Sequence, residues 1–137
     1  MLPDYTDFTR LFLTYEVSKI QINWKPEYTE LTDAALVSNA INVNFNSAID
    51  QTDATAPSSV QQVIQYQSNK STGITKQHVR NFIPAMLMDG TTPCSCYIST
   101  NSPSEYLYGV KVGVPPTGVA MTFRATITYW ITCSGAR

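Results

Sequence analysis

The chain has 137 residues, of which 43% are hydrophobic and only 14% are charged, and its formal net charge is −1. A chain of this length commonly forms one domain and buries enough surface to fold without a metal or a disulfide. The balanced charge gives no basic field for nucleic acid or membranes, and no run of 18 apolar residues is present to span a membrane. Because a surface poor in charge promotes association, the composition favours a protein that assembles.

The opening of the chain, residues 1–12, carries Pro3 and aromatic residues spaced three and four apart. This spacing predicts one or two turns of helix, with the proline tolerated in the first turn. We expect the apolar side of this helix to cover the edge of a sheet.

A first strand is predicted from Leu13 to Trp24. Apolar residues alternate along it, and the phase slips by one residue between Ser18 and Lys19 before the alternation resumes. A slip of this kind indicates a β-bulge, which inserts one residue and keeps the apolar side chains on one face. Pro26 is expected to end the strand, because proline cannot donate to the ladder.

The middle of the chain combines a strand, a loop and a short helix. Residues 41–46 alternate between apolar and polar and predict a second strand, and residues 47–59 predict a polar loop. Ser59 and Gln62 have the spacing of a capping box, which predicts a short helix over about 59–66, exposed on the loop.

A charged strand is predicted over residues 74–83, where Lys76, His78 and Arg80 share one row and Pro84 follows. We expect His78, the only histidine, to be partly exposed on this strand. Two further strands are predicted after it, one with Cys94, Cys96 and Ile98 on one face and one over residues 106–114, where valines and tyrosines alternate with glycine and Lys111.

The longest pattern lies near the C-terminal end, where every odd position from Val119 to Cys133 is apolar and most even positions are polar. This period of two predicts a strand whose odd row, including Ile127, lies in the core and whose Thr, Arg and Trp row faces solvent. Short strands, polar loops and almost no helix together predict an all-β fold, an antiparallel sandwich or barrel. We expect residues 1–137 to form one domain.

The sequence offers little support for catalysis or metal binding. A hydrolase needs a nucleophile, a base and an orienting group, and no nucleophile elbow accompanies His78. Cys94, Cys96 and Cys133 lack the spacing of a zinc knuckle and lie on apolar rows, so buried free thiols are the favoured interpretation. Their odd number fits a reducing compartment. We therefore predict no enzyme activity, no cofactor and no metal.

Five residues are candidates for contact with nucleic acid: Lys76, His78 and Arg80 of the charged strand, and Arg124 and Trp130 on the polar row of the last strand. Basic side chains neutralise phosphates, and an aromatic ring can stack on a base. Ordinary solvated charges, or ion pairs between subunits, explain each of these residues equally well.

Four motifs occur in a characteristic order and cover most of the chain. They are Leu2-Pro3-x-Tyr5-x-x-Phe8-x-x-Leu11-Phe12 leading into Tyr15-x-Val17-x-Lys19-Ile20-x-Ile22, Ala56-Pro57-Ser58-Ser59 before the short helix, Arg80-x-Phe82-x-Pro84 at the end of the charged strand, and Phe123-Arg124-Ala125-Thr126-Ile127-Thr128-Tyr129 in the last strand. In this order and spacing the chain resembles the capsid proteins of circovirus-like viruses, the circular Rep-encoding single-stranded DNA viruses.

The resemblance implies a single jelly roll of two four-stranded sheets, sixty copies of which form a T=1 icosahedral shell around a single-stranded DNA genome. It also implies a location in the virion, passage through the host nucleus during assembly, a host-cell surface receptor as a further partner, and no cofactor or membrane contact. Family members begin with an arginine-rich arm and a further first strand. We find neither in this sequence and expect the first strand of the jelly roll to be missing from this chain.

Two other interpretations stay open. The first is the coat protein of a small RNA virus, because such viruses build their coats from the same jelly roll. A non-viral β-sandwich that binds carbohydrate is the second, because Trp24, Trp130 and the tyrosines offer rings that can stack on sugars. Particle size separates the last from the coat proteins, since a carbohydrate-binding module stays a monomer or a small oligomer.

Overall fold

The computed structural model describes residues 10–27, 43–53, 55–88, 92–94, 97–101, 107, 109–116 and 121–136, most of which lie in strands. The strands are β1 (Phe12–Glu27), β2 (Asn44–Ile49), β3 (Lys70–Gly73), β4 (His78–Phe82), β5 (Met86–Met88), β6 (Thr92–Cys94), β7 (Ile98–Ser99), β8 (Val110–Gly113) and β9 (Thr122–Ala136), and the helix α3 spans Val60–Ile64. The predominance of strands, with one short helix, confirms the prediction of an all-β fold.

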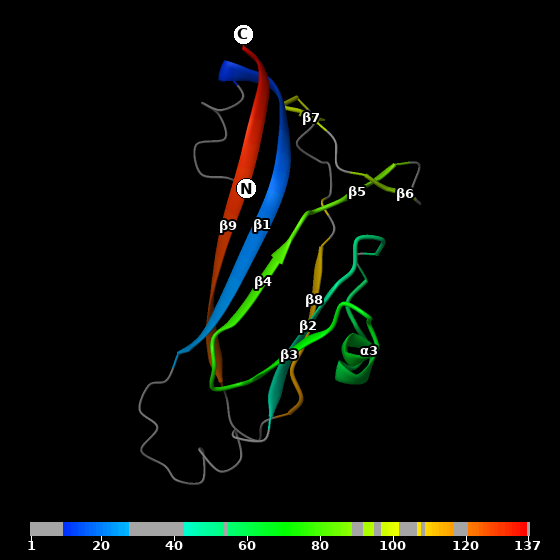
Figure 1. Cartoon of the computed structure of the whole chain (residues 1–137), viewed down its shortest axis with the longest axis vertical. Coiled ribbons are helices and arrows are strands. Elements are labelled where there is room, and N and C mark those ends of the chain that lie inside the picture. Colours follow the sequence, from blue (N-terminus) through cyan, green and yellow to red (C-terminus); the bar gives the residue numbers. More distant parts are fainter. Residues whose placement is uncertain are drawn as a thin grey trace.

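Two antiparallel sheets form the two layers of the structure (Figure 1). In the large sheet, β1 lies between β9 on one side and β4 and β7 on the other. In the small sheet, β2 lies between β3 and β8, and β5 and β6 pair separately. The antiparallel sandwich is confirmed, but within the described residues the small sheet has three strands rather than the four implied by the resemblance.

The β-bulge predicted in the first strand is present. β1 pairs with β9 from Phe12 opposite Ala136 to Glu27 opposite Thr122, and the register shifts between Val17 and Lys19. Because of this shift, Val17 and Ile20 both lie in the buried core although they are three positions apart, an odd spacing that would place them on opposite faces of a regular strand.

Pro26 does not end β1, contrary to the expectation. It lies opposite Phe123 in the β1–β9 ladder, and the strand continues to Glu27. β4 pairs with β1 only as far as Trp24. Among the described residues, therefore, no strand on that side of Pro26 requires the amide hydrogen that proline lacks.

The core lies between the two sheets. Its buried apolar cluster comprises Val17, Ile20, Ile22 and Phe82, all from the large sheet. Aromatic rings join the layers, since Trp24 of β1 and Phe123 of β9 both contact Phe45 of β2, with centroids 5.3 and 5.2 Å apart.

The second strand and the short helix differ in part from the predictions. β2 runs over Asn44–Ile49 rather than 41–46, so the first residues of the predicted loop 47–59 belong to the strand. α3 begins after Ser59, whose hydroxyl accepts a hydrogen bond from the Gln62 N–H at 3.3 Å, which confirms the cap. The helix is not simply exposed, because Val63 is fully buried against the small sheet.

Residues 74–83 do not form one strand. β3 ends at Gly73 in the small sheet, and β4 begins at His78 in the large sheet. The row of His78, Arg80 and Phe82 faces the core, because Arg80 and Phe82 lie opposite the buried Ile22 and Ile20. The row that carries His78 and Arg80 therefore lies inside the sandwich, although both side chains are polar.

The long last strand is confirmed over the described residues, but its apolar row is not buried as predicted. Ile127 and Tyr129 lie opposite Ile22 and Ile20 and so point between the sheets, yet their side chains are 46% and 43% exposed. Both side chains line a groove between the sheets, and β8, which lines the other side of it, has only 4 residues against the 15 of β9.

Some predictions fall outside the described residues, namely most of the opening helix, Cys96 and the start of the strand predicted over 106–114. Cys94 and Ile98 lie in different strands, β6 and β7, which pair with different partners. The single short strand expected to hold both is therefore wrong.

Candidate functional site

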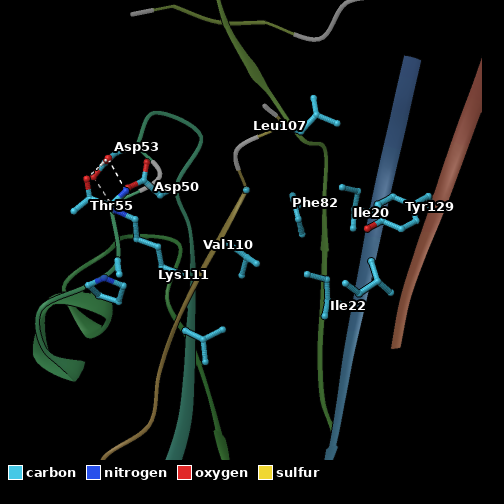
Figure 2. A pocket seen from close by; sticks show the side chains of 15 residues that line it. Ile20, Ile22, Asp50, Asp53, Thr55, Phe82, Leu107, Val110, Lys111 and Tyr129 are labelled. Carbon is cyan, nitrogen blue, oxygen red and sulfur yellow. Dashed lines mark hydrogen bonds and ion pairs between the residues drawn. The ribbon is translucent and has the colours of Figure 1, made fainter. Parts of the chain in front are cut away.

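A groove of about 530 Å³ lies between the two sheets, and Figure 2 shows it from close by. Its wall on the large sheet is apolar and is formed by Ile20, Ile22, Phe82, Ile127 and Tyr129. The opposite wall is formed by β8 and by the loop after β2, which contribute Val110, Val112, Asp50, Asp53, Thr55 and Lys111. The groove therefore has an apolar side and a side that carries charge.

An ion cluster of Lys111, Asp50, Asp53 and Tyr66 forms the charged side. The Lys111 Nζ lies 2.9 Å from the Asp50 Oδ2 and 3.1 Å from the Asp53 Oδ2, and the Tyr66 hydroxyl donates to the Asp50 Oδ2 at 2.7 Å. Lys111 and Asp50 are buried, whereas the Asp53 side chain is 49% exposed. The cluster carries one cation and two anions, so it presents net negative charge to the groove.

Hydrogen bonding controls the protonation of this cluster. Burial opposes ionisation of Asp50, but hydrogen bonds from Lys111, Tyr66 and Thr52 hold its pKa well below its usual range. Hydrogen bonds from Thr55 lower the pKa of Asp53, and the hydrogen bond to Asp50 raises the pKa of Lys111. All three groups are therefore ionised near neutral pH.

Lys111 was missed as a buried residue by sequence reasoning, which placed it on the row opposite the valines of its strand. The feature of the sequence that could have indicated its burial is a single lysine between two valines, Val110 and Val112. A lysine in such a strand must either face solvent or meet carboxylates inside, and here it meets two.

His78 is buried between the sheets, which corrects the expectation of a partly exposed residue. Its side chain is 1% exposed, its Nε2 lies 2.6 Å from the Ser47 Oγ, and its Nδ1 lies 2.8 Å from the Thr72 Oγ1. Burial, assisted by the cations Lys70 and Arg80, lowers its pKa to about 4. The imidazole is therefore neutral at pH 7, and one ring nitrogen donates while the other accepts.

The Ser47–His78 pair has the spacing of a nucleophile and its base. However, Ser47 is fully buried, and the rings of Trp24 and Phe45 pack against the imidazole at centroid distances of 5.6 and 4.8 Å. The pair is closed to a substrate in this structure. Its geometry suits a polar link that joins β2 and β3 of the small sheet to β4 of the large sheet.

Arg80 is also buried. Its Nη2 donates to the carbonyl oxygen of Ser68 at 2.6 Å, and its Nε has no hydrogen-bond partner among the described residues. His78 and Arg80 thus lie inside the sandwich, where neither side chain can reach a nucleic acid on the surface. This burial removes two of the five predicted contact residues.

The other three predicted contact residues are exposed but do not lie together. Arg124 and Trp130 share the outer face of the large sheet, which we define as the rows Lys19, Gln21, Asn23 and Lys25 of β1 and Arg124, Thr126, Thr128 and Trp130 of β9. Lys76 lies in the turn between β3 and β4. The contact of Lys76, Arg124 and Trp130 with nucleic acid stays a prediction.

Arg124 and Trp130 both have partners within the chain. The Arg124 guanidinium lies 2.5 Å from the Glu27 carboxylate, and the Lys19 Nζ lies 4.7 Å from the centroid of the Trp130 ring. The sequence alone did not indicate Glu27 and Lys19 as the partners of Arg124 and Trp130, because only the pairing of β1 with β9 brings them together.

Within the described residues, no group of three or more His, Cys, Asp or Glu side chains is placed to hold a metal ion. Cys94 and Cys133 are only partly buried, so the burial predicted for them is incomplete. None of the described helices is long and apolar enough to cross a membrane.

The two facing antiparallel sheets fit a jelly roll, and solved structures of viral capsids superpose on the chain. One, titled "Red Clover Necrotic Mosaic Virus", superposes with a TM-score of 0.54 over 95% of this chain, at 11% sequence identity. Another is a T=1 subviral particle of a Penaeus vannamei nodavirus capsid protein deletion mutant, with a TM-score of 0.53 over 96% of this chain, also at 11% identity.

These likenesses establish the fold alone, because the sequences are only 11% identical. The chain spans 41% of the length of the first structure and 75% of the second. Comparison of the sequence with models of protein families and with curated proteins finds no match.

Proposed function

We propose that the chain is the shell-forming part of the coat protein of a small virus, and that its function is to assemble with copies of itself. The observation that carries this proposal is the likeness of 95% or more of the chain to two viral capsid structures. One of them is itself a T=1 particle, which supports a small closed shell, sixty copies in the T=1 case, and a location in the virion.

The surface of the protein supports this proposal. The outer face of the large sheet is long, and threonine side chains occupy much of its β9 row. Its Arg124 and Lys19 side chains are already engaged by Glu27 and Trp130. A broad face with few free charges suits contact between subunits, since the centres of interfaces are depleted in charge.

The proposal has two versions, which differ in whether the shell encloses a DNA or an RNA genome. The sequence resemblance favours a circovirus-like virus with a single-stranded DNA genome and assembly in the host nucleus. An RNA genome fits the structural neighbours better, because the necrotic mosaic virus and the nodavirus are RNA viruses. We therefore place the RNA version first. A host-cell receptor stays part of either version.

The carbohydrate-binding alternative is weakened by the positions of the tryptophans. Trp24 packs between the sheets against Phe45 and His78, and Lys19 covers the ring of Trp130. A sugar platform needs exposed ring faces, whereas Trp24 packs against the core and a cation already lies over the ring of Trp130, which is 41% exposed.

Sedimentation of the purified chain tests the proposal. A shell of sixty copies of the 15.2 kDa chain has a mass of about 0.9 MDa. We expect particles of this order over some range of pH and ionic strength, and negative-stain images should show closed shells. Digestion of their contents with DNase or RNase then distinguishes the two genomes. A chain that stays monomeric in every condition and binds a polysaccharide would contradict the proposal.

A further inference from the structure

The chain crosses from the small sheet to the large sheet between β3 and β4 (Figure 1). In the described part of the structure both are edge strands, since β3 pairs only with β2 and β4 pairs only with β1. Between positions 70 and 80, Ile74 is the only apolar residue that is buried. Segments with few buried apolar contacts open at a lower free energy than the core of a protein. Residues 70–80 therefore form a segment that can open before the long β1–β9 ladder does.

His78 holds this segment against both sheets. It is the first residue of β4, and its ring nitrogens lie 2.6 Å from the Ser47 Oγ of β2 and 2.8 Å from the Thr72 Oγ1 of β3. The side chain is 1% exposed, and the rings of Trp24 and Phe45 pack against it. One imidazole thus joins three strands from the two sheets at the point where the chain crosses between them.

The charged groups that act on His78 are both cations. The Lys70 Nζ donates to the carbonyl oxygen of Val79 at 2.9 Å, and the Arg80 Nη2 donates to the carbonyl oxygen of Ser68 at 2.6 Å. The residues that β1 and β2 pack against the ring are uncharged. Within the described residues, no carboxylate forms an ion pair with Lys70, His78 or Arg80. A proton on the imidazole therefore adds a third positive charge to a site that has no anion to balance it.

We propose that His78 is an acid-sensitive link between the two sheets: when the imidazole takes up a proton, residues 70–80 separate from the sandwich while the β1–β9 ladder stays paired. Separation carries the imidazolium from a buried site into water, which stabilises its charge. The link is a property of the single chain, so the proposal goes beyond assembly of the shell and does not depend on it.

The pKa of His78 sets the pH range of this opening. In the closed structure burial, followed by the cations Lys70 and Arg80, lowers the pKa to about 4, whereas the ordinary value is 6.5. As the pH falls below 6.5, the open segment binds a proton that the closed segment does not, until the pH reaches about 4. Linkage between the two pKa values predicts that the open population grows about a hundredfold between pH 7 and pH 4.

Hydrogen exchange followed by mass spectrometry tests the proposal on the full 137-residue chain. Each rate is divided by the rate of an unstructured peptide at the same pH, so that it reports opening alone. We expect peptides from residues 70–80 to lose about a hundredfold of their protection between pH 7 and pH 4 and to exchange faster than peptides from β1 and β9 at both pH values. Equal protection of the three regions at pH 4 would overturn the proposal, because the chain would then open only as a whole.

Two variants and one control assign the effect to His78. His78→Gln should remove the pH dependence from residues 70–80, and the same hundredfold change in this variant would contradict the proposal. Lys70→Gln should make the pH dependence smaller, because it removes one of the cations that oppose protonation. Lys76→Gln removes an exposed lysine of the turn and should leave the pH dependence unchanged. If His78→Gln does not fold, the two lysine variants decide, since an equal pH dependence in both would also overturn the proposal.

Discussion

Protonation of His78 is expected to lower the free energy of unfolding as the pH falls from 6.5 towards 4. The imidazole is buried between Ser47 and Thr72, and burial together with the nearby cations Lys70 and Arg80 lowers its pKa from 6.5 to about 4. A base with a depressed folded-state pKa contributes its full stability above the unfolded-state pKa. That contribution is lost as the pH falls through the folded-state pKa.

The magnitude follows from the two pKa values. Their difference corresponds to about 3 kcal/mol, at about 1.4 kcal/mol per pH unit. This is a large part of the roughly 5–15 kcal/mol that stabilises a typical domain. Asp50, whose pKa is lowered from 3.8, loses its stabilising effect only below that ordinary value. The stability lost between pH 6.5 and 4 is therefore assigned to His78.

Urea unfolding followed by tryptophan fluorescence measures this loss, because Trp24 contacts the imidazole at a centroid distance of 5.6 Å. His78→Gln keeps a polar side chain that does not titrate, so its stability should be nearly constant over the same pH range. The difference between the two proteins should shrink by about 3 kcal/mol from pH 7 to pH 4. Parallel loss of stability in both proteins would refute the assignment to His78.

Three further substitutions have expected outcomes that urea unfolding can check. Lys111→Met leaves Asp50 buried without its cation and should cost about 3 kcal/mol. Gly109→Ala would place a Cβ against the Phe82 ring and should cost about 1–3 kcal/mol. Ile127→Asp should cost less than about 1 kcal/mol, because its side chain is 46% exposed.

Matched controls accompany these substitutions. Lys76→Met removes an exposed lysine and Gly73→Ala adds a Cβ with nothing within 4 Å. Each control should change the free energy of unfolding by about 0.5 kcal/mol or less. Stability losses that are equal in control and variant would contradict the roles assigned to Lys111 and to the close approach at Gly109. A loss of several kcal/mol in Ile127→Asp would contradict the partial exposure of the Ile127 side chain.

The period-two patterns of the sequence were sufficient to predict the strands at the two ends. The alternation around Ser18 located the bulge, because only an inserted residue keeps Val17 and Ile20 on one face. The alternation near the C-terminal end located β9. These patterns report local geometry, which depends on neighbouring residues alone.

The buried polar residues could not be predicted in this way. His78, Arg80 and Lys111 each lie inside because partners from other strands satisfy them, namely Ser47 and Thr72, the Ser68 carbonyl, and Asp50 with Asp53. Their partners lie 6 to 61 positions away in the sequence, and no spacing rule connects them. Burial of a charge is a property of the folded neighbourhood, so it appears only once the strands are placed.

The pairing of β1 with β9 also dictates when the protein can complete its fold. Ser18 and Trp130, which are joined by a hydrogen bond, are separated by 112 positions in the sequence. During synthesis, β1 leaves the ribosome long before its main partner and must wait with an unpaired edge until β9 emerges. Such long-range pairing slows folding and exposes the nascent chain to aggregation. Premature termination before Thr122 would therefore remove the longest ladder of the large sheet and yield a chain dependent on chaperones.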